Sequence, residues 1–294
     1  MSTVLISGGS GVIGNELKMF LKTNGYNINI LSRQPTQKEK NIHNWNLNTQ
    51  YIDKEAFENV SVVINLAGSP IIGNRWTTKN KEKHRNSRIL STRLLVNTIN
   101  QKQLPIKHFI QASAMGYYGH SGDKPITESS ENGKDFMASL CEDWENEAKK
   151  LNNNVELSIL RIGLYLSKSG GVHKKISDLS KFYLASGFGS GKQYVNYSHR
   201  DEFNLLVLRI INQGIKAGTY NAVGKQACTL NDFVKEVIYN SKSKMLLPNI
   251  PAFALKLILG EASSALLNSY NVTSEKLNND FFLYSNIKEA IENL

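Results

Sequence analysis

The chain has 294 residues, of which 40% are hydrophobic and 20% charged, a composition typical of a globular protein with a sizeable core. No run of about 18 uncharged apolar residues occurs, so we expect no membrane span. The two cysteines, Cys141 and Cys228, form neither a CxxC motif nor a zinc-type pattern with histidine. The first residues, MSTVLIS, lack the charged region of a signal peptide. Together these features predict a cytoplasmic protein without a metal site.

The formal net charge is +10, and basic residues are densest in the stretch TTKNKEKHRNSR at 77–88. A basic balance can indicate nucleic-acid binding, which would here use Lys79, Lys81, Lys83 and Arg85. No aromatic RNA-binding motif or basic repeat accompanies the stretch, so a solvated helix face is the favoured interpretation. We expect a small-molecule substrate and neither nucleic acid nor a membrane as a partner. The oligomeric state does not follow from the sequence.

Short β-branched runs alternate with helical patterns through the N-terminal half. The predicted strands are TVLIS (3–7), NINILS (27–32), SVVINLA (61–67), KHFIQAS (107–113) and VELSILRIG (155–163). The segments between them carry apolar residues at helical spacing, for example Ile13, Leu17 and Leu21. Strands that alternate with helices indicate βαβ crossovers. We therefore predict an α/β fold with a doubly wound, mostly parallel Rossmann sheet.

The pattern becomes less regular after about residue 165. A loop is predicted at the glycine-rich stretch 186–193, and helices are predicted at 200–213, 229–240 and 251–267. We predict a nucleotide-binding core at 1–165, with returning elements around 195–225. The remainder, 166–294, is predicted to be a smaller mixed, largely helical region packed on the core at the substrate side.

Four glycines lie between the first predicted strand and the first helical pattern, at Gly8, Gly9, Gly11 and Gly14. Glycines at this place permit a tight strand-to-helix turn and a close approach of the backbone to a pyrophosphate. The helix N-terminus then offers free N–H groups to the phosphates. No Gly-Lys-Ser/Thr follows, which excludes a P-loop. A glycine turn without a ligand is the alternative.

The end of the second predicted strand discriminates between the two nicotinamide dinucleotides. An NAD site requires a carboxylate about 20 residues after the glycines, to bind the ribose hydroxyls. Ser32 and Arg33 occupy this place. An arginine can pair with a 2′-phosphate, which an aspartate would repel. NADP is therefore favoured over NAD, with a merely solvated Arg33 as the alternative.

Several longer stretches resemble one known family. ISGGSGVIG resembles the GGxGxxG of extended and atypical short-chain dehydrogenases/reductases. ASAMGYYG, LRIGLYLSKSGG and GSGKQYVNYSHRDE resemble its epimerase-family group of YfcH-type, also called SulA-like, proteins. The tail LPNIPAFALKLILGEASSALLNSYNVTSEKL resembles the short C-terminal domain of that group. The likeness runs almost from end to end.

The resemblance implies a set of cofactor contacts and leaves the chemistry open. The implied cofactor-binding residues are Gly8, Gly11, Val12, Ile13, Ser32, Arg33, Leu66, Ala67, Gly68, Arg88 and Leu164. Related enzymes add a Ser or Thr and a Tyr-x-x-x-Lys pair. Ser113 matches the Ser, whereas Met137 and Cys141 stand where the Tyr and Lys belong, so the pair is missing.

Other side chains could take over acid–base duty. Tyr117 and Tyr118 are the first candidates, with packing aromatics as the alternative. His199 and Asp201 are further candidates, and they could instead be a structural histidine and a helix cap. Arg161 and Trp76 could line a substrate pocket, or be an ion-pair partner and a buried anchor.

Two functions are consistent with these features. The first is an NADP-dependent oxidoreductase that transfers hydride to or from a small carbonyl, alcohol or nucleotide-sugar-like substrate. The second is a non-catalytic, NADP-dependent regulator of a partner such as the cell-division machinery.

Overall fold

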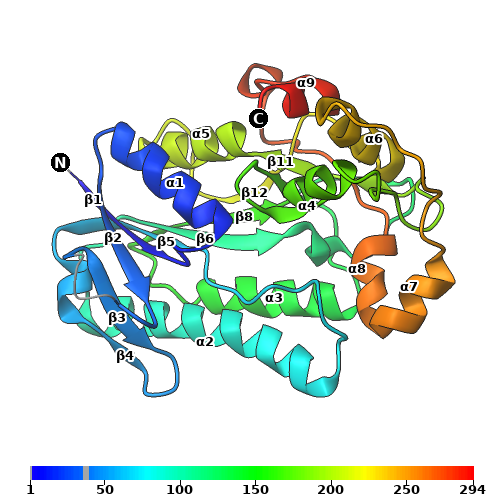
Figure 1. The fold of residues 1–294 in the computed structure, drawn as a ribbon. Coiled ribbons are helices and arrows are strands. Elements are labelled where there is room, and N and C mark those ends of the chain that lie inside the picture. The colour runs from blue at the N-terminus through cyan, green and yellow to red at the C-terminus, as the bar shows by residue number, and fades with distance from the viewer. Residues whose placement is uncertain (1, 36–39) are drawn as a thin grey trace.

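The computed structural model describes residues 2–35 and 40–294, and a central sheet lies between two layers of helices in it (Figure 1). The strand order is β12-β8-β6-β5-β1-β2-β3-β4. Neighbouring strands are parallel, except for the antiparallel edge pair β3 and β4. The bounds are β1 Thr3–Ser7, β2 Asn27–Ser32, β3 Ile42–Asn46, β4 Tyr51–Ile52, β5 Val60–Asn65, β6 His108–Ala114, β8 Glu156–Ile162 and β12 Thr219–Ala222.

The predicted doubly wound α/β fold is confirmed by this order, because the chain winds outward from β1 in both directions. Predicted strands 3–7 and 27–32 match β1 and β2, and the other three agree to within two residues. Strands β3 and β4 were not predicted. The sequence of β3, IHNWN, carries polar residues at most positions, and edge strands are only half covered.

Helices cover both faces of the sheet. Helices α1 (Val12–Thr23) and α5 (Arg200–Ile211) lie on one face, while α2 (Thr78–Lys102) and α3 (Phe136–Ala148) lie on the other (Figure 1). Alternate residues of a strand point to opposite faces. Hence Val4 and Ile6 pack in the cluster that includes α1 and α5, whereas Leu5 packs in the cluster that includes α2. Burial on both faces explains the continuous apolar runs that revealed these strands.

The C-terminal half adds further helices beside the sheet (Figure 1). Three two-stranded sheets pair β10 with β13, β9 with β11, and β14 with the earlier strand β7. A separate apolar cluster joins α4, α6 and α9. The boundary at residue 165 stays a prediction, and both α5 and β12 follow it in the chain yet belong to the central layers. The bounds are β7 Pro125–Ile126, β9 Leu164–Leu166, α4 Gly171–Ser180, β10 Tyr194–Val195, β11 Tyr197–His199, β13 Cys228–Thr229, α6 Leu230–Asn240, α7 Ala252–Leu259, α8 Ser264–Leu267, β14 Asn271–Val272 and α9 Ile287–Glu292.

The predicted helix at 251–267 was wrong as a single element. It divides into α7 and α8, with a 3₁₀ turn over Gly260–Ser263 between them. Gly260 has a φ of 60°, a left-handed conformation that ends an α-helix. The predicted helices at 200–213 and 229–240 are observed as α5 and α6. Within the described ranges, no helix is both long and apolar enough to cross a bilayer.

Candidate functional site

The turn between β1 and α1 brings three backbone segments unusually close together. Gly8 has a φ of 73°, and a Cβ there would lie 2.7 Å from the carbonyl group of Leu66. A Cβ on Gly14 would collide with the Gly8 carbonyl oxygen, and Gly11 donates its N–H to that same oxygen at 3.0 Å. Gly11 is also the N-cap of α1 and offers no side-chain acceptor, so the first-turn N–H groups stay open. The turn therefore requires glycine at positions 8 and 14.

A half-buried arginine faces the same edge of the sheet. Arg88 extends from α2 over Gly68, whose Cβ would lie 3.0 Å from the guanidinium carbon. Its amino groups donate to the backbone oxygens of Ser69 at 3.1 Å and His84 at 3.2 Å, and its guanidinium lies 5.1 Å from the ring of Trp144. Desolvation lowers the pKa of Arg88. Among the described residues, no carboxylate forms an ion pair with this guanidinium, so its charge is free to meet an anion.

The other implied cofactor residues follow strands whose carboxyl ends meet at one edge. Ser32 ends β2 beside β1, and its Oγ accepts from the N–H of Gln34 at 3.2 Å, while Arg33 is exposed. The Leu66 N–H donates to the Ser7 carbonyl at 3.1 Å, and a Cβ on Gly8 would lie 3.0 Å from the backbone nitrogen of Ala67. Leu164 follows β8, and its N–H donates to Asn196 at 2.7 Å. The assignments of these residues to cofactor contacts stay predictions.

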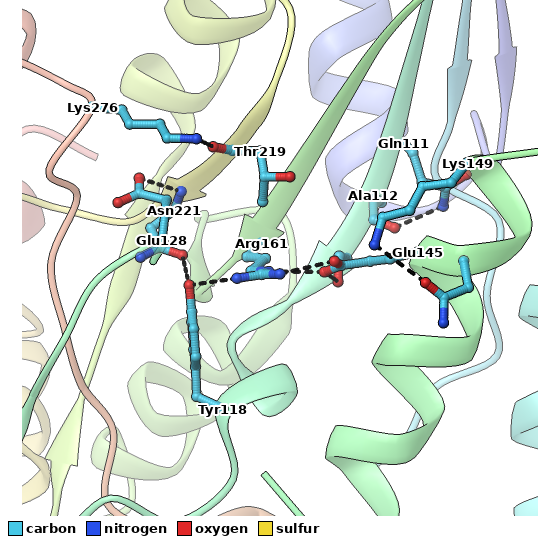
Figure 2. Close-up of polar contacts among 12 residues, drawn as sticks. Gln111, Ala112, Tyr118, Glu128, Glu145, Lys149, Arg161, Thr219, Asn221 and Lys276 are labelled. Carbon is cyan, nitrogen blue, oxygen red and sulfur yellow. Dashed lines mark hydrogen bonds and ion pairs between the residues drawn. The ribbon is translucent and has the colours of Figure 1, made fainter. Parts of the chain in front are cut away.

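A chain of buried polar groups runs from Ser113 to Asn221 across five elements: β6, α3, β8, the 3₁₀ turn Met115–Tyr118, and β12. Figure 2 shows its part from Glu145 through Arg161 and Tyr118 to Asn221. Glu145 of α3 accepts two hydrogen bonds from Arg161, at 2.8 and 2.9 Å, and a third from the Ser113 hydroxyl at 2.7 Å. The third guanidinium nitrogen donates to the Tyr118 hydroxyl at 2.8 Å, which in turn donates to Asn221 at 2.6 Å. All five side chains are buried. We call this set the Arg161 network.

Two predicted catalytic residues, Ser113 and Tyr118, donate their hydroxyl hydrogen bonds within the Arg161 network. The Ser113 hydroxyl donates its hydrogen bond to the Glu145 carboxylate, so that only the lone pairs of the Ser113 oxygen remain for a ligand. Burial raises the pKa of Tyr118 to about 12, and its hydroxyl both accepts from Arg161 and donates to Asn221. In this arrangement both residues hold the network together. Their catalytic roles stay predictions.

Tyr117 differs from its neighbour, because it is only half-buried. Its ring centroid lies 3.5 Å from the guanidinium carbon of Arg161, a cation–π stack. Burial raises the pKa of Tyr117, and the Arg161 charge opposes that rise because it favours the phenolate. Tyr117 therefore differs from the buried Tyr118 in that it has a cation beside its ring and is also partly exposed to solvent.

Packing side chains occupy the two places where a Tyr-x-x-x-Lys pair would stand. A Cβ on Gly116 would lie 3.1 Å from the terminal carbon of Met137 and 3.8 Å from the sulfur of Cys141, so both face the turn that follows Ser113. Burial raises the pKa of Cys141 to about 12. A thioether has no proton, and a neutral thiol carries no charge. Neither can replace the missing pair.

The remaining candidates have structural surroundings. His199 is fully buried, and its Nδ1 accepts from the N–H of Asp201 at 3.2 Å, so His199 and not Asp201 caps α5. Burial lowers the pKa of His199 to about 4, which keeps it neutral at pH 7. Trp76 is buried against Phe136, with ring centroids 5.1 Å apart.

A hollow of about 810 Å³ lies between the loop at 186–193 and the α7–α8 segment. His120, two residues after Tyr118, forms part of its wall, as does Asn268, whose amide donates to Asp135 at the start of α3. The volume is that of a small-molecule site.

Sequence reasoning missed Glu145 and Asn221. Glu145 lies in a helical stretch with other acids, Glu142 and Glu147, and spacing alone does not show which of them is buried. Asn221 lies within the short strand β12, and no motif surrounds it. The one available signal was Arg161, a charge near the end of a largely apolar strand, where it needs a buried partner.

A parallel sheet with a glycine-rich first turn and an open helix N-terminus defines a Rossmann-type fold of the short-chain dehydrogenase/reductase class. The sequence model of the NAD dependent epimerase/dehydratase family matches residues 4–222. An epimerase family protein of Staphylococcus haemolyticus is 30% identical, over 100% of this chain and 99% of its own. The chain belongs to this family, and the predicted resemblance is confirmed.

Further relatives agree in length and fold. The chloroplastic SDR39U1 homolog of Arabidopsis thaliana is 28% identical, over 98% of this chain and 85% of its own. The crystal structure of human epimerase family protein SDR39U1 with NADPH superposes with a TM-score of 0.88 at 21% identity, covering 99% of this chain and 98% of that one. A nucleoside-diphosphate sugar epimerase from Corynebacterium glutamicum has a TM-score of 0.78 at 27% identity, covering 99% of this chain and 57% of that longer chain.

Proposed function

We propose that this protein binds NADP(H) at the carboxyl edge of its sheet and uses it as an oxidoreductase. The observation that carries the proposal is the cationic cradle: a turn that requires glycine at Gly8 and Gly14 faces Arg88, an arginine with no carboxylate partner among the described residues. Both features suit a pyrophosphate, which needs close backbone and positive charge. The residues therefore fit a dinucleotide.

Each part of the cradle has a role toward this ligand. The open N–H groups at the start of α1 would hold the pyrophosphate, with Arg88 supplying charge. Ser32 and Arg33 at the end of β2 would hold the 2′-phosphate that distinguishes NADP from NAD. The NADPH in the human SDR39U1 structure supports this choice.

The substrate would be a small carbonyl or alcohol compound, related to a sugar, in the hollow beside α7. A sugar nucleotide is suggested by the name of the Corynebacterium relative. When bound, the nicotinamide gives or takes the hydride. Tyr117 would hold or release the accompanying proton at its phenolic oxygen, because the Arg161 guanidinium under its ring stabilises the phenolate. Glu145 fixes that guanidinium through two hydrogen bonds.

The second candidate is a regulator that binds NADP without turning over a substrate. It is favoured by Met137 and Cys141 at the places of the missing pair and by the engaged protons of Ser113 and Tyr118. Cofactor occupancy would then control a partner, such as a component of the division machinery.

Two measurements test these proposals. Arg33→Asp should weaken NADP binding by about tenfold to a hundredfold more than NAD binding, because a charge-assisted phosphate contact is lost. Lys54→Asp, an equal charge change at another exposed position, should leave both affinities unchanged. Equal loss of NADP and NAD affinity in Arg33→Asp would refute the 2′-phosphate assignment.

Turnover is measured as loss of NADPH absorbance across carbonyl compounds and nucleotide sugars. Tyr117→Phe should lower turnover by about 10²-fold or more and leave NADPH affinity unchanged. Micromolar NADPH binding without turnover on any substrate, together with a retrievable protein partner, would replace the enzyme by the regulator.

A further inference from the structure

Large apolar side chains are concentrated on the outside of the C-terminal region. The turn that ends α4 exposes Phe182, Tyr183 and Leu184, with Phe182 72% accessible. The segment before α7 exposes Leu246 and Leu247. Helix α7 lies at the end of the molecule opposite the N-terminus (Figure 1). Scattered exposed apolar residues are ordinary, but a concentration of them indicates a binding surface.

Hydrogen bonds show that two of these segments lie side by side. The Ser243 hydroxyl donates to the Ser180 carbonyl at 2.5 Å, and the Ile250 N–H donates to the Gly187 carbonyl at 3.0 Å. The Gly189 N–H donates back to Ile250 at 2.8 Å. Residues 180–189 and 243–250 therefore run alongside each other, and the exposed side chains of both lie between these ties.

Helix α7 extends the same surface. It begins directly after Ile250 and Pro251, and its Phe253 and Leu257 are 74% and 75% accessible. Residues four apart lie on one helix face, so these two side chains point the same way. Leu255 is the buried residue of α7 and faces inward. We call the exposed apolar residues of 179–184, 246–250 and α7 the apolar strip.

The charges within the apolar strip are positive. Residues 179–192 and 239–258 contain five lysines and no aspartate or glutamate: Lys181, Lys192, Lys242, Lys244 and Lys256. All five are exposed. Lys181 is paired with Asp178 of α4, at 2.9 Å, and the other four form no ion pair among the described residues. Asp178 and Glu261 adjoin the strip, but each is paired with a lysine, so the four lysines without an ion pair leave the border net cationic. Such a surface complements an apolar body with an anionic border.

We propose that the apolar strip is a peripheral membrane-binding surface for bilayers that contain anionic lipids. Phe, Tyr and Leu side chains enter the boundary between headgroups and acyl chains, while lysine stems reach back to the phosphates. Lysines near an anionic leaflet add electrostatic attraction. No spanning helix is needed for a protein that lies on the surface.

Two other occupants fit the strip less well. In a symmetric dimer the same patch meets itself, so the lysines of one copy would face those of the other. Single-stranded nucleic acid needs aromatic platforms on which its bases stack. Three exposed side chains of the strip are aromatic, Phe182, Tyr183 and Phe253, whereas the other seven are aliphatic and offer no face on which a base can stack.

Vesicle co-sedimentation of the full chain tests the proposal. We expect binding to phosphatidylcholine vesicles that contain about a third phosphatidylglycerol, weaker binding at high salt, and none to pure phosphatidylcholine. The double variant Phe253→Ser/Leu257→Ser should lower the partition coefficient by at least about tenfold. Met19→Ser, an exposed apolar residue of α1, is the matched control and should bind normally.

Charge is tested in the same way. Lys242→Glu/Lys244→Glu should lower partitioning by about fivefold or more for each lysine, whereas Lys79→Glu/Lys83→Glu removes equal charge from α2 and should have little effect. Equal losses in the two variants would overturn the proposal, since general charge would then explain the binding. It would also be overturned by absent vesicle binding, by preferred binding of a single-stranded oligonucleotide, or by a dimer that the Phe253→Ser/Leu257→Ser variant abolishes. Unchanged thermal unfolding shows that each variant is folded.

Discussion

Replacing Glu145 by Gln removes the only carboxylate that neutralises Arg161 within the described chain. The glutamine still reaches the Ser113 hydroxyl and part of the guanidinium, so the shape of the site is kept. The guanidinium then stays buried, bound to Tyr118 and a neutral amide. We expect this variant to be strongly destabilised, because a buried charge without its counter-ion is costly.

The size of the effect follows from burial. The side chains of Arg161 and Glu145 are 6% and 1% accessible, so water cannot replace the lost charge. Breaking a buried ion pair from one side costs about 3–5 kcal/mol of unfolding free energy. For a domain of this size that corresponds to a fall of about 6–10 °C in Tm.

Differential scanning calorimetry at pH 7 measures this fall, and the same helix provides a control. Glu147 also accepts two hydrogen bonds from an arginine, Arg93, but the Arg93 side chain is 43% accessible and stays hydrated. Glu147→Gln should therefore cost no more than about 1 kcal/mol. Equal falls in Tm for the two variants would refute the reasoning. The double variant Glu145→Leu/Arg161→Met should recover much of the loss.

Three further predictions concern other parts of the chain. Gly8→Ala should abolish dinucleotide binding, measured by fluorescence titration, whereas Gly25→Ala, with a similar φ of 83° but open space around it, should retain it. Burial raises the pKa of Glu202 to about 7, so wild-type unfolding free energy should fall by about 1–3 kcal/mol relative to Glu202→Gln between about pH 5 and pH 8, and a constant difference would contradict this. Cys141 and Cys228, whose pKa values burial raises to about 12, should react with iodoacetamide much more slowly than free cysteine at pH 8, as mass spectrometry would show.

The glycine turn could be predicted because its signal is local. The left-handed φ of Gly8 and the clash of a Gly14 Cβ with the Gly8 carbonyl oxygen arise within the turn itself and require glycine, whereas the approach of Gly8 to Leu66 depends on the packing of β1 beside β5. The central strands could be predicted equally well, because a strand that is buried on both faces has a continuous apolar sequence. Strand β3, which lies between β2 and the edge strand β4, lacks such a run. The division between α7 and α8 depends on Gly260, in a stretch whose apolar pattern continues through it.

The Arg161 network was decided by tertiary structure. The register of β6 against β8 sets Ser113 opposite Arg161, and the packing of α3 then brings Glu145 to both. Which of several acids in a helix becomes buried depends on contacts between residues far apart in sequence. Local periodicity and backbone geometry therefore determined the sheet and its glycine turn, while long-range register and packing decided which charges meet.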